Sequence, residues 1–243
     1  MSWSEQSRIG IVGAGAAGLS AARFLEDRGF EHVTVLEREE RVGGQCRSIE
    51  HRGRTFDLGA LFVTGAFERV SALGRRYGVE ASARTGGFVR LESGEAERPT
   101  ADPRWLEALE ARLAELARES GPLAGLERPG FAGVHPEATV PFSEFVARYE
   151  LRGLPQLLAP FFVGYGYGYF DEVPAAHVLK YMNAAMRRAC FATGEVFFVD
   201  GGFDSLWRAV ARELDVRVAE TVTAISRGDD EVHVETDRGE YRF

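Results

Sequence analysis

An apolar run that leads into a glycine-rich turn constrains the fold of this chain more than any other feature. Residues 8–12 (R-I-G-I-V) are followed by Gly13, Gly15 and Gly18 in the pattern G-x-G-x-x-G. A helix-forming stretch then extends to about Arg28. This order predicts a strand, a tight turn and a helix, which together begin a βαβ unit.

Each glycine has a separate role in such a turn. Gly13 permits the tight turn out of the strand, and Gly15 lacks a Cβ, so a pyrophosphate can approach the backbone. Gly18 lets the helix pack close to the strand. Free N–H groups at the start of the helix, around Ala16 and Ala17, would point at the phosphates, and the helix dipole adds a favourable field.

A second apolar run, residues 32–36, ends in Glu37. A carboxylate at this point can accept hydrogen bonds from both hydroxyls of a ribose, and it would repel the 2′-phosphate of NADP. The glycine pattern alone is a weak signal, but here the strand, glycines, helix, strand and acid occur in order. The sequence therefore predicts a dinucleotide site, and the alternative is a doubly wound domain without a ligand.

Length and composition limit the class of protein. The 243 residues allow one large domain or two modest ones. A net charge of -8 argues against nucleic acid or an anionic membrane surface as a partner. No apolar run approaches the roughly 18 residues of a transmembrane helix, and the N-terminus lacks the basic region of a signal peptide. Two cysteines, Cys46 and Cys190, suit a reducing compartment, so we expect a cytoplasmic protein.

Helices dominate the middle of the chain and β segments its end. A helix is expected to start at Asp102 as N-cap, with Pro103 in the first position, and to end at Gly121. Further helices are predicted at 67–77, 142–149, 154–162, 174–188 and 203–214. Strands or hairpins are predicted at 54–63, 84–98, 195–199, 216–218, 221–226, 231–236 and 240–243.

Residues 161–170 (F-F-V-G-Y-G-Y-G-Y-F) alternate glycine with tyrosine and are poorly suited to a helix. One interpretation is a strand that packs its aromatic face on a core. The other is a mobile aromatic wall of a substrate cavity. In the second case Phe162, Tyr165 and Tyr167 are the candidate substrate-binding residues.

The segment L-E-R-E-E-R-V-G-G (36–44) is absent from NAD dehydrogenases. Together with the glycine turn it resembles the flavin-containing amine oxidase superfamily, which includes monoamine oxidases, protoporphyrinogen oxidases and phytoene desaturases. The resemblance covers residues 8–60 and 201–243, the N-terminal portion of such a protein. Residues 165–176 look most like relatives of β-cyclopiazonate dehydrogenase. The resemblance implies non-covalently bound FAD.

The resemblance also implies which residues hold the FAD. In the family the glutamate binds the adenosine ribose and the Gly-Gly loop lies along the cofactor. Gln45 stands where the family usually has a phosphate-contacting arginine, and Arg47 follows two residues later. Cys46 is expected to be a small buried residue rather than a covalent flavin attachment. The expected cofactor residues are Gly13, Gly15, Ala16, Ala17, Gly18, Glu37, Arg38, Arg41, Gly43, Gly44, Gln45, Arg47, Gly59, Ala60, Leu61 and Val222.

Two of these positions match specific family contacts. Gly59 and Ala60, followed by Leu61, match the loop that passes the isoalloxazine ring. Val222 matches the valine whose backbone meets the adenine. The histidines show no metal-ligand spacing, and Asp57 is expected to be solvated or capping rather than catalytic.

The expected fold is α/β. It has an FAD-binding doubly wound (Rossmann-like) domain with a β-meander, formed by residues 1–83 and 201–243, and a mostly helical inserted substrate domain at 84–200. The strand at 8–12 is apolar on both faces and needs two neighbours. The strand at 32–37 supplies one, and the strand near Val216 extends the sheet beyond it. We therefore expect a sheet that is incomplete at the C-terminus, to be closed by a missing segment, a complementing chain or homo-oligomer, or a shortened fold.

Three functions fit these features. The first is an FAD-dependent oxidoreductase, amine oxidase- or desaturase-like, that transfers a hydride from a C–N or C–C bond of a small hydrophobic substrate to flavin. The second is a non-catalytic or incomplete FAD-binding subunit that needs a partner. The third is a non-oxidative flavoenzyme, an isomerase or mutase. No triad or carboxylate dyad is found, so no catalytic residue is assigned.

Overall fold

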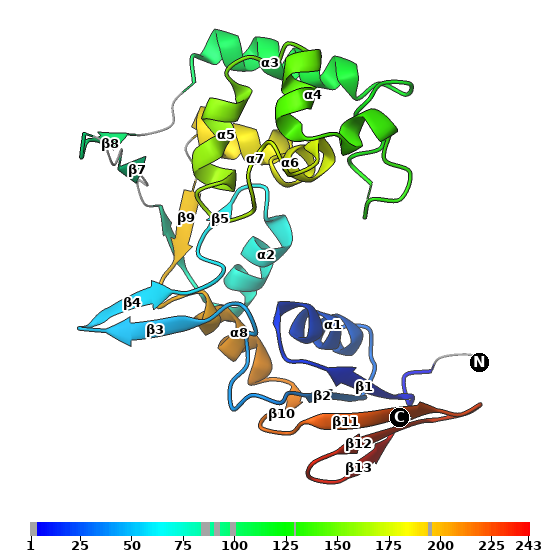
Figure 1. Cartoon of the computed structure of the whole chain (residues 1–243). Helices are drawn as coiled ribbons and strands as arrows, with labels where there is room; N and C mark the ends of the chain where they lie inside the picture. Colours follow the sequence, from blue (N-terminus) through cyan, green and yellow to red (C-terminus); the bar gives the residue numbers. More distant parts are fainter. Residues whose placement is uncertain (1–3, 84–87, 90–92, 98–100, 129, 194–195) are drawn as a thin grey trace. The chain divides into compact units, whose positions relative to one another are not determined.

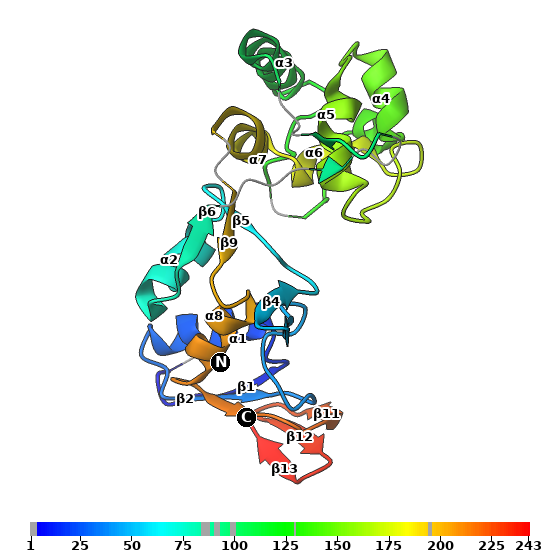
Figure 2. The ribbon, with the colours of Figure 1, turned by 90° about the vertical axis from the view of Figure 1, so that its left-hand side faces the viewer.

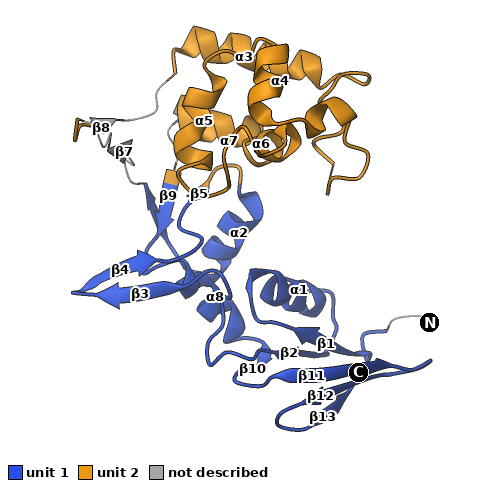
Figure 3. Cartoon of the chain, in the orientation of Figure 1, with its two compact units in different colours: residues 1–63, 67–83, 197–243 blue, residues 64–66, 84–196 orange. Residues whose placement is uncertain are grey.

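The structure is a computed structural model that describes residues 4–83, 88–89, 93–97, 101–128, 130–193 and 196–243. It divides into two compact units (Figure 3). Unit 1 comprises residues 1–63, 67–83 and 197–243, and unit 2 comprises residues 64–66 and 84–196. Unit 1 is therefore built from both ends of the chain. No helix among the described residues has the length and apolar character needed to cross a bilayer.

A parallel sheet of three strands forms the centre of unit 1 (Figure 1). The strands β1 (Arg8–Val12), β2 (His32–Leu36) and β10 (Asp215–Arg217) lie in the order β1-β2-β10. Helix α1 (Ala16–Glu26) joins β1 to β2 and packs with α8 (Asp204–Ala211) in a core that includes Leu19, Val35 and Leu206. The predicted βαβ start and the place of the strand near Val216 are confirmed.

Strand β1 lies at one edge of this sheet, because among the described strands only β2 pairs with it. Val12 is 57% exposed there, and Ile225 on the neighbouring meander is 45% exposed. A groove of about 730 Å³ runs beside this edge and is lined in part by Val12, Ile225 and Phe243. The single neighbour found for β1 is the one that the sequence predicted.

The β-meander consists of β11 (Val222–Arg227), β12 (Val232–Thr236) and β13 (Glu240–Arg242), paired antiparallel in that order. It lies beside β1 and β2 in both views of the ribbon (Figure 1, Figure 2). A Cβ added to Gly10 would lie 2.5 Å from the ring of Phe243. The glycine within β1 therefore makes room for the aromatic ring at the end of β13.

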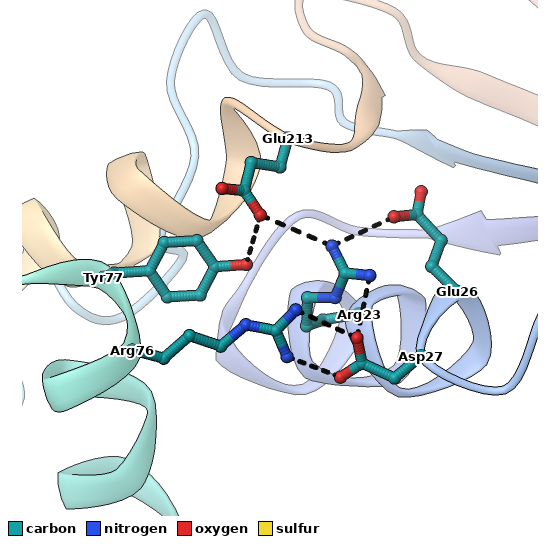
Figure 4. Close-up of polar contacts among 6 residues, drawn as sticks. All are labelled: Arg23, Glu26, Asp27, Arg76, Tyr77 and Glu213. Atoms are coloured by element: carbon teal, nitrogen blue, oxygen red, sulfur yellow. Dashed lines mark hydrogen bonds and ion pairs between the residues drawn. The ribbon is translucent and has the colours of Figure 1, made fainter.

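A polar network on the surface of unit 1 connects α1 to α2 (Glu68–Tyr77) and to the segment after α8. Arg23 forms ion pairs with Asp27 at 2.9 Å and with Glu213 at 3.5 Å. Arg76 reaches the other side of Asp27 at 2.6 Å. The Arg23 side chain is 13% exposed, whereas its partners Asp27 and Glu213 are 41% and 55% exposed. Ion pairs with a solvated partner contribute little singly, about 0–1 kcal/mol each. The network comprises Arg23, Glu26, Asp27, Arg76, Tyr77 and Glu213 (Figure 4).

Short strands complete unit 1, except that Thr64 of β5 and Val196 of β9 are assigned to unit 2. The hairpin of β3 (Ser48–His51) and β4 (Arg54–Asp57) was predicted only in its second half, because the side chains of β3 are mostly exposed and show no apolar alternation. Strands β5 (Val63–Thr64), β9 (Val196–Val199) and β6 (Ala81–Ala83) form a sheet in the order β5-β9-β6. Helix α2 ends at Gly78, whose φ of 64° is left-handed, as the sequence predicted.

Unit 2 is mostly helical. Its helices are α3 (Pro103–Leu116), α4 (Phe142–Arg148), α5 (Leu154–Phe162), α6 (Ala175–Tyr181) and α7 (Ala184–Arg187), with a 3-10 helix at Pro136–Thr139 and a π-helix at Arg188–Thr193. Strands β7 (Phe88–Val89) and β8 (Ala96–Glu97) pair antiparallel. The rest of the hairpin predicted at 84–98, apart from residues 93–95, lies outside the described residues, as does Glu195 of the predicted strand at 195–199.

The start of α3 is as predicted, but two helix ends are not. The Asp102 carboxylate accepts hydrogen bonds from the backbone N–H groups of Arg104 and Trp105 at 2.9 and 3.0 Å. The helix ends at Leu116 rather than at Gly121, because the chain turns first and Gly121 then packs back against the Leu116 carbonyl. The single helix predicted at 174–188 is broken because the side chain of Asn183 caps a new helix at the N–H of Met186.

The strand interpretation of residues 161–170 is wrong. Phe161 and Phe162 complete α5, and turns follow in which Gly166 and Gly168 have left-handed φ values of 79° and 112°. The Tyr167 N–H donates to the Phe162 carbonyl at 3.1 Å, which closes the first turn. The glycines at 166 and 168 therefore meet a need for positive φ and do not mark the two faces of a strand.

Candidate dinucleotide-binding site

The turn between β1 and α1 is built as the glycines predict. Gly13 has a φ of 99°, and its N–H donates to the Leu36 carbonyl at 2.7 Å, which joins the ends of β1 and β2. A Cβ on Gly18 would lie 1.9 Å from the Gly13 carbonyl oxygen and 3.3 Å from a methyl group of Ile11. Only glycine at position 18 allows α1 to lie this close to the strand.

Two glycine segments lie side by side at the start of α1. Gly15 forms a parallel bridge with Gly43, and the Gly43 N–H donates to the Ala14 carbonyl at 2.8 Å. A Cβ on Gly44 would lie 3.0 Å from the Cα of Gly15. Gly15 is the N-cap of α1 and offers no side-chain acceptor, and the first turn carries no acidic residue. The first backbone N–H groups of a helix have no acceptor within the helix, so this turn suits an anion.

Glu37 is held at the end of β2 with only 8% of its surface exposed. One carboxylate oxygen accepts the Ala14 N–H at 2.7 Å, and the other accepts the Glu39 N–H at 2.9 Å. Each carboxylate oxygen can accept a second hydrogen bond. The arrangement therefore leaves capacity for two ribose hydroxyls while the backbone fixes the orientation of the group. The sequence predicted the acid but not its two backbone donors.

We expect Glu37→Gln to weaken FAD binding by about tenfold or more. The amide nitrogen would face the N–H of Ala14 or of Glu39, so one buried donor would lose its acceptor, at a cost of about 1–3 kcal/mol. A fluorescence titration with FAD measures the change. Glu40→Gln, which alters an exposed carboxylate three residues away, is the matched control. Equal affinities of the two variants would contradict the role of Glu37.

The arginines near this loop differ in their surroundings. The Arg41 guanidinium donates to the Gly44 carbonyl at 3.1 and 3.2 Å, so it shapes the Gly43–Gly44 loop. Arg38 is exposed and forms an ion pair with Glu39 at 3.5 Å. Arg47 is exposed and its backbone carbonyl accepts the N–H of Leu58 at 2.8 Å. All three of these described arginines are exposed, but only the Arg41 guanidinium donates hydrogen bonds to the Gly43–Gly44 loop.

Residues 58–61 lie against residues 45–47. A Cβ on Gly59 would lie 1.8 Å from the Gln45 carbonyl oxygen, so the two loops touch at their backbones. Ala60 is exposed and Leu61 is half-buried. The structure thus brings together two segments that the sequence assigned to the cofactor separately.

The start of β11 is joined to the Glu37 loop by the backbone. The Glu37 N–H donates to the Arg217 carbonyl at 2.8 Å, and the Glu220 N–H donates to the Glu37 carbonyl at 2.9 Å. Val222, the residue expected to meet the adenine, follows two residues later. All the expected cofactor residues therefore belong to unit 1, whereas Phe162, Tyr165 and Tyr167 belong to unit 2.

A contact that the sequence did not reveal orients the hairpin that precedes Gly59. The Asp57 carboxylate accepts the Phe203 N–H at 2.8 Å and the Ser48 hydroxyl at 2.5 Å. The Ser48 oxygen in turn accepts the Asp204 N–H at 3.2 Å. Asp57 is thus a capping residue for α8, one of the two roles expected for it. No sequence pattern indicates the contact between Ser48 and Asp204, because these residues are far apart in the chain.

Both cysteines are free and buried. Burial raises the pKa of the Cys46 thiol, and it raises that of Cys190 to about 11. Because a raised pKa favours the neutral thiol, both groups are protonated at pH 8 in the folded chain. We expect alkylation by iodoacetamide at pH 8 to be at least about tenfold slower in the folded than in the urea-unfolded chain. Equal rates would contradict the burial of these thiols.

Comparison with known proteins identifies the family. The sequence profile of the family described as flavin containing amine oxidoreductase matches residues 16–243. The chain belongs to this family. Membership confirms the resemblance that the sequence suggested, and it indicates FAD as the cofactor.

Curated relatives cover different shares of the chain. Protoporphyrinogen oxidase 2 of Arabidopsis thaliana is 46% identical over 66 residues, which is 27% of this chain and 13% of that protein. An uncharacterized protein of Acanthamoeba polyphaga mimivirus is 26% identical over 251 residues, which covers 89% of this chain and 49% of its own length. The chain therefore spans about half, or less, of the length of these relatives.

Solved structures match the whole described fold. The CLA-producing fatty acid isomerase from P. acnes superposes with a TM-score of 0.84 at 31% identity, covering 99% of this chain and 58% of that one. Cyclohexylamine oxidase from Brevibacterium oxydans superposes with a TM-score of 0.69 at 20% identity, covering 98% and 56%. The second likeness shows the fold alone.

Proposed function

We propose that unit 1 holds FAD non-covalently and that the loaded protein is an oxidoreductase acting on a C–N or C–C bond of a small hydrophobic substrate. The observation that carries this proposal is the pair of bare glycine segments, at Gly15 and at Gly43–Gly44, beside the buried carboxylate of Glu37. When bound, FAD supplies the acceptor for the hydride that the substrate loses.

We call the residues proposed to hold FAD the cradle: the Gly13–Gly18 turn, Glu37, the Gly43–Gly44 loop, residues 58–61 and Val222. Each of these segments is proposed to contact a different part of the cofactor. The start of α1, from Gly15 to Gly18, would hold the pyrophosphate. Glu37 would accept from the ribose, and the backbone at Val222 would meet the adenine. The Gly43–Gly44 loop, held by Arg41, and residues 58–61 would lie along the rest of the cofactor. Gln45 and Arg47, both exposed, are proposed contacts on this side.

Unit 2 is proposed to receive the apolar part of the substrate through its tyrosines. Tyr165 is 36% exposed and Tyr167 is 50% exposed. The ring centroid of Tyr167 lies 5.5 Å from that of Phe162 and 4.6 Å from that of Tyr181. The half-exposed ring of Tyr167 therefore packs against the buried ring of Phe162. Burial raises the pKa of Tyr165 and of Tyr181, so both hydroxyls are neutral. An uncharged aromatic surface of this kind suits an apolar ligand.

Tyr167→Ala is expected to raise KM for a hydrophobic substrate about threefold to tenfold with little change in kcat. An aromatic contact contributes about 0.5–1.5 kcal/mol beyond area burial, and this contact is made before the reaction. Steady-state kinetics with the FAD-loaded protein measures the change. Tyr169→Ala, two residues further along the chain and 63% exposed, is the matched control. A fall in kcat at unchanged KM would contradict a substrate-binding role.

An absorbance spectrum tests the central proposal. The purified chain should show bands at about 370 and 450 nm after FAD is added and the excess removed. Acid precipitation should release the flavin, because no covalent attachment is proposed. Hydrophobic amines and alkenes are then tested anaerobically for bleaching of the 450 nm band. A folded chain that never retains flavin would refute the proposal, and flavin without any bleaching would favour the binding-only alternative.

A second candidate is a redox-neutral isomerisation. The observation that favours it is the match to the fatty acid isomerase, at 31% identity over almost the whole chain. Incubation of the FAD-loaded protein with a polyunsaturated fatty acid separates the candidates. A product of unchanged mass with shifted double bonds, formed without an external acceptor, indicates isomerisation. A product that has lost two hydrogen atoms indicates oxidation.

A further inference from the structure

A second buried carboxylate lies next to the cradle. Glu220 is 5% exposed, and it and Glu37 are two of the four buried polar or charged side chains among the described residues. One oxygen of Glu220 accepts hydrogen bonds from the hydroxyls of Thr236 and Tyr241, each at 2.8 Å. Thr236 ends β12 and Tyr241 belongs to β13, so a single carboxylate connects the residues before β11 to both other strands of the meander.

The backbone beside this carboxylate binds the Glu37 loop. The Glu220 N–H donates to the Glu37 carbonyl at 2.9 Å, and the Ala219 N–H donates to the Glu39 carbonyl at 2.8 Å. Ala219 has a φ of 54°, a left-handed conformation that alanine rarely adopts. Such a conformation persists only where the surrounding contacts hold it. Here the conformation of Ala219 is held by the hydrogen bonds of the Glu220 carboxylate to the meander and by the backbone hydrogen bonds to residues 37–39.

A buried carboxylate is costly unless hydrogen bonds compensate for its lost hydration. Packing of a meander needs only apolar side chains, so the charged group at position 220 calls for another explanation. We propose that Glu220 is a positioning residue for the cofactor. It fixes the backbone of residues 219–220 against residues 37–39, and so it holds the Glu37 carboxylate where the ribose hydroxyls bind.

The inference rests on the proposed FAD site and has a readout other than activity. The probes are ADP and 2′-deoxy-ADP, titrated into the full chain by calorimetry. If Glu37 accepts the 2′-hydroxyl, the wild type should favour ADP about tenfold, the scale of a charge-assisted hydrogen bond. Glu220→Leu should reduce this preference to less than about threefold. Glu220→Gln, whose amide oxygen still accepts from a hydroxyl, should retain most of it.

Glu235→Gln changes an exposed carboxylate on β12 and serves as the matched control. A folded Glu220→Leu chain that keeps the wild-type preference would overturn the inference, even if its melting temperature falls. If that variant does not fold, Tyr241→Phe and Thr236→Val each remove one donor, and an unchanged preference in both would overturn it as well. A wild type that binds neither nucleotide would refute the FAD site itself, and with it the role of Glu220.

Discussion

Gly18→Ala is expected to destabilise unit 1 by roughly 3 kcal/mol and to abolish the binding of FAD at micromolar concentrations. The added Cβ would lie 1.9 Å from the Gly13 carbonyl oxygen and 3.1 Å from the carbonyl carbon. Both are backbone atoms, so a change of rotamer cannot relieve the overlap. Helix α1 must instead move away from β1, and the N–H groups at its start move with it.

Two further alanine substitutions separate the fold from the ligand. Gly239→Ala adds a Cβ with no atom within 4 Å, so stability should change by less than about 0.5 kcal/mol. Gly15→Ala has its closest contact at 3.7 Å, to the Cα of Gly44. It should therefore leave stability nearly unchanged but weaken FAD binding, because the methyl group occupies the space proposed for the pyrophosphate.

Urea denaturation without FAD measures the stability of the three glycine variants, and a fluorescence titration measures their affinity for FAD. A Gly18→Ala chain as stable as the wild type would show that α1 can shift without cost, and would contradict the steric role of this glycine. A Gly15→Ala chain with unchanged affinity would place the pyrophosphate away from residue 15.

The turn between β1 and α1 could be predicted because each of its constraints is local. The bounds predicted for β1 and β2 from their apolar runs agree with the structure, and the glycines between them limit the turn to one geometry. The backbone partners of Glu37 could not be predicted in the same way. They depend on how Ala14 and residues 217–220 come together, and the latter lie far away in the sequence.

The structure of residues 161–170, by contrast, could not be predicted from the sequence. Alternation of glycine and tyrosine has the period of a strand, and nothing in the sequence distinguishes that pattern from glycines needed for left-handed turns. Similarly, Asn183 lies in a stretch with helical periodicity, and only the hydrogen bond from the Met186 N–H to its side chain reveals a new N-cap. Ser48 was missed because a hydroxyl in an exposed strand gives no sign of a distant partner.

Glu110→Ala is expected to destabilise unit 2 by about 3–5 kcal/mol, because it leaves a buried charge without its partner. Arg187 is only 4% exposed, and its guanidinium donates to both Glu110 oxygens, at 2.5 and 2.7 Å. It also donates to the Met182 carbonyl, at the break between α6 and α7. The substitution removes the carboxylate from α3 and leaves a buried guanidinium without an anionic partner.

An exposed pair on the same helix provides the control. Arg112 and Glu115 lie 2.6 Å apart with about half of each side chain exposed, so Glu115→Ala should cost less than about 1 kcal/mol. The double variant Glu110→Leu with Arg187→Met should recover most of the loss, because it removes both charges. Urea denaturation followed by fluorescence measures all three, and equal losses for Glu110→Ala and Glu115→Ala would contradict the buried ion pair. Because the proposed FAD residues belong to unit 1, Glu110→Ala should retain the flavin spectrum while substrate-dependent bleaching falls.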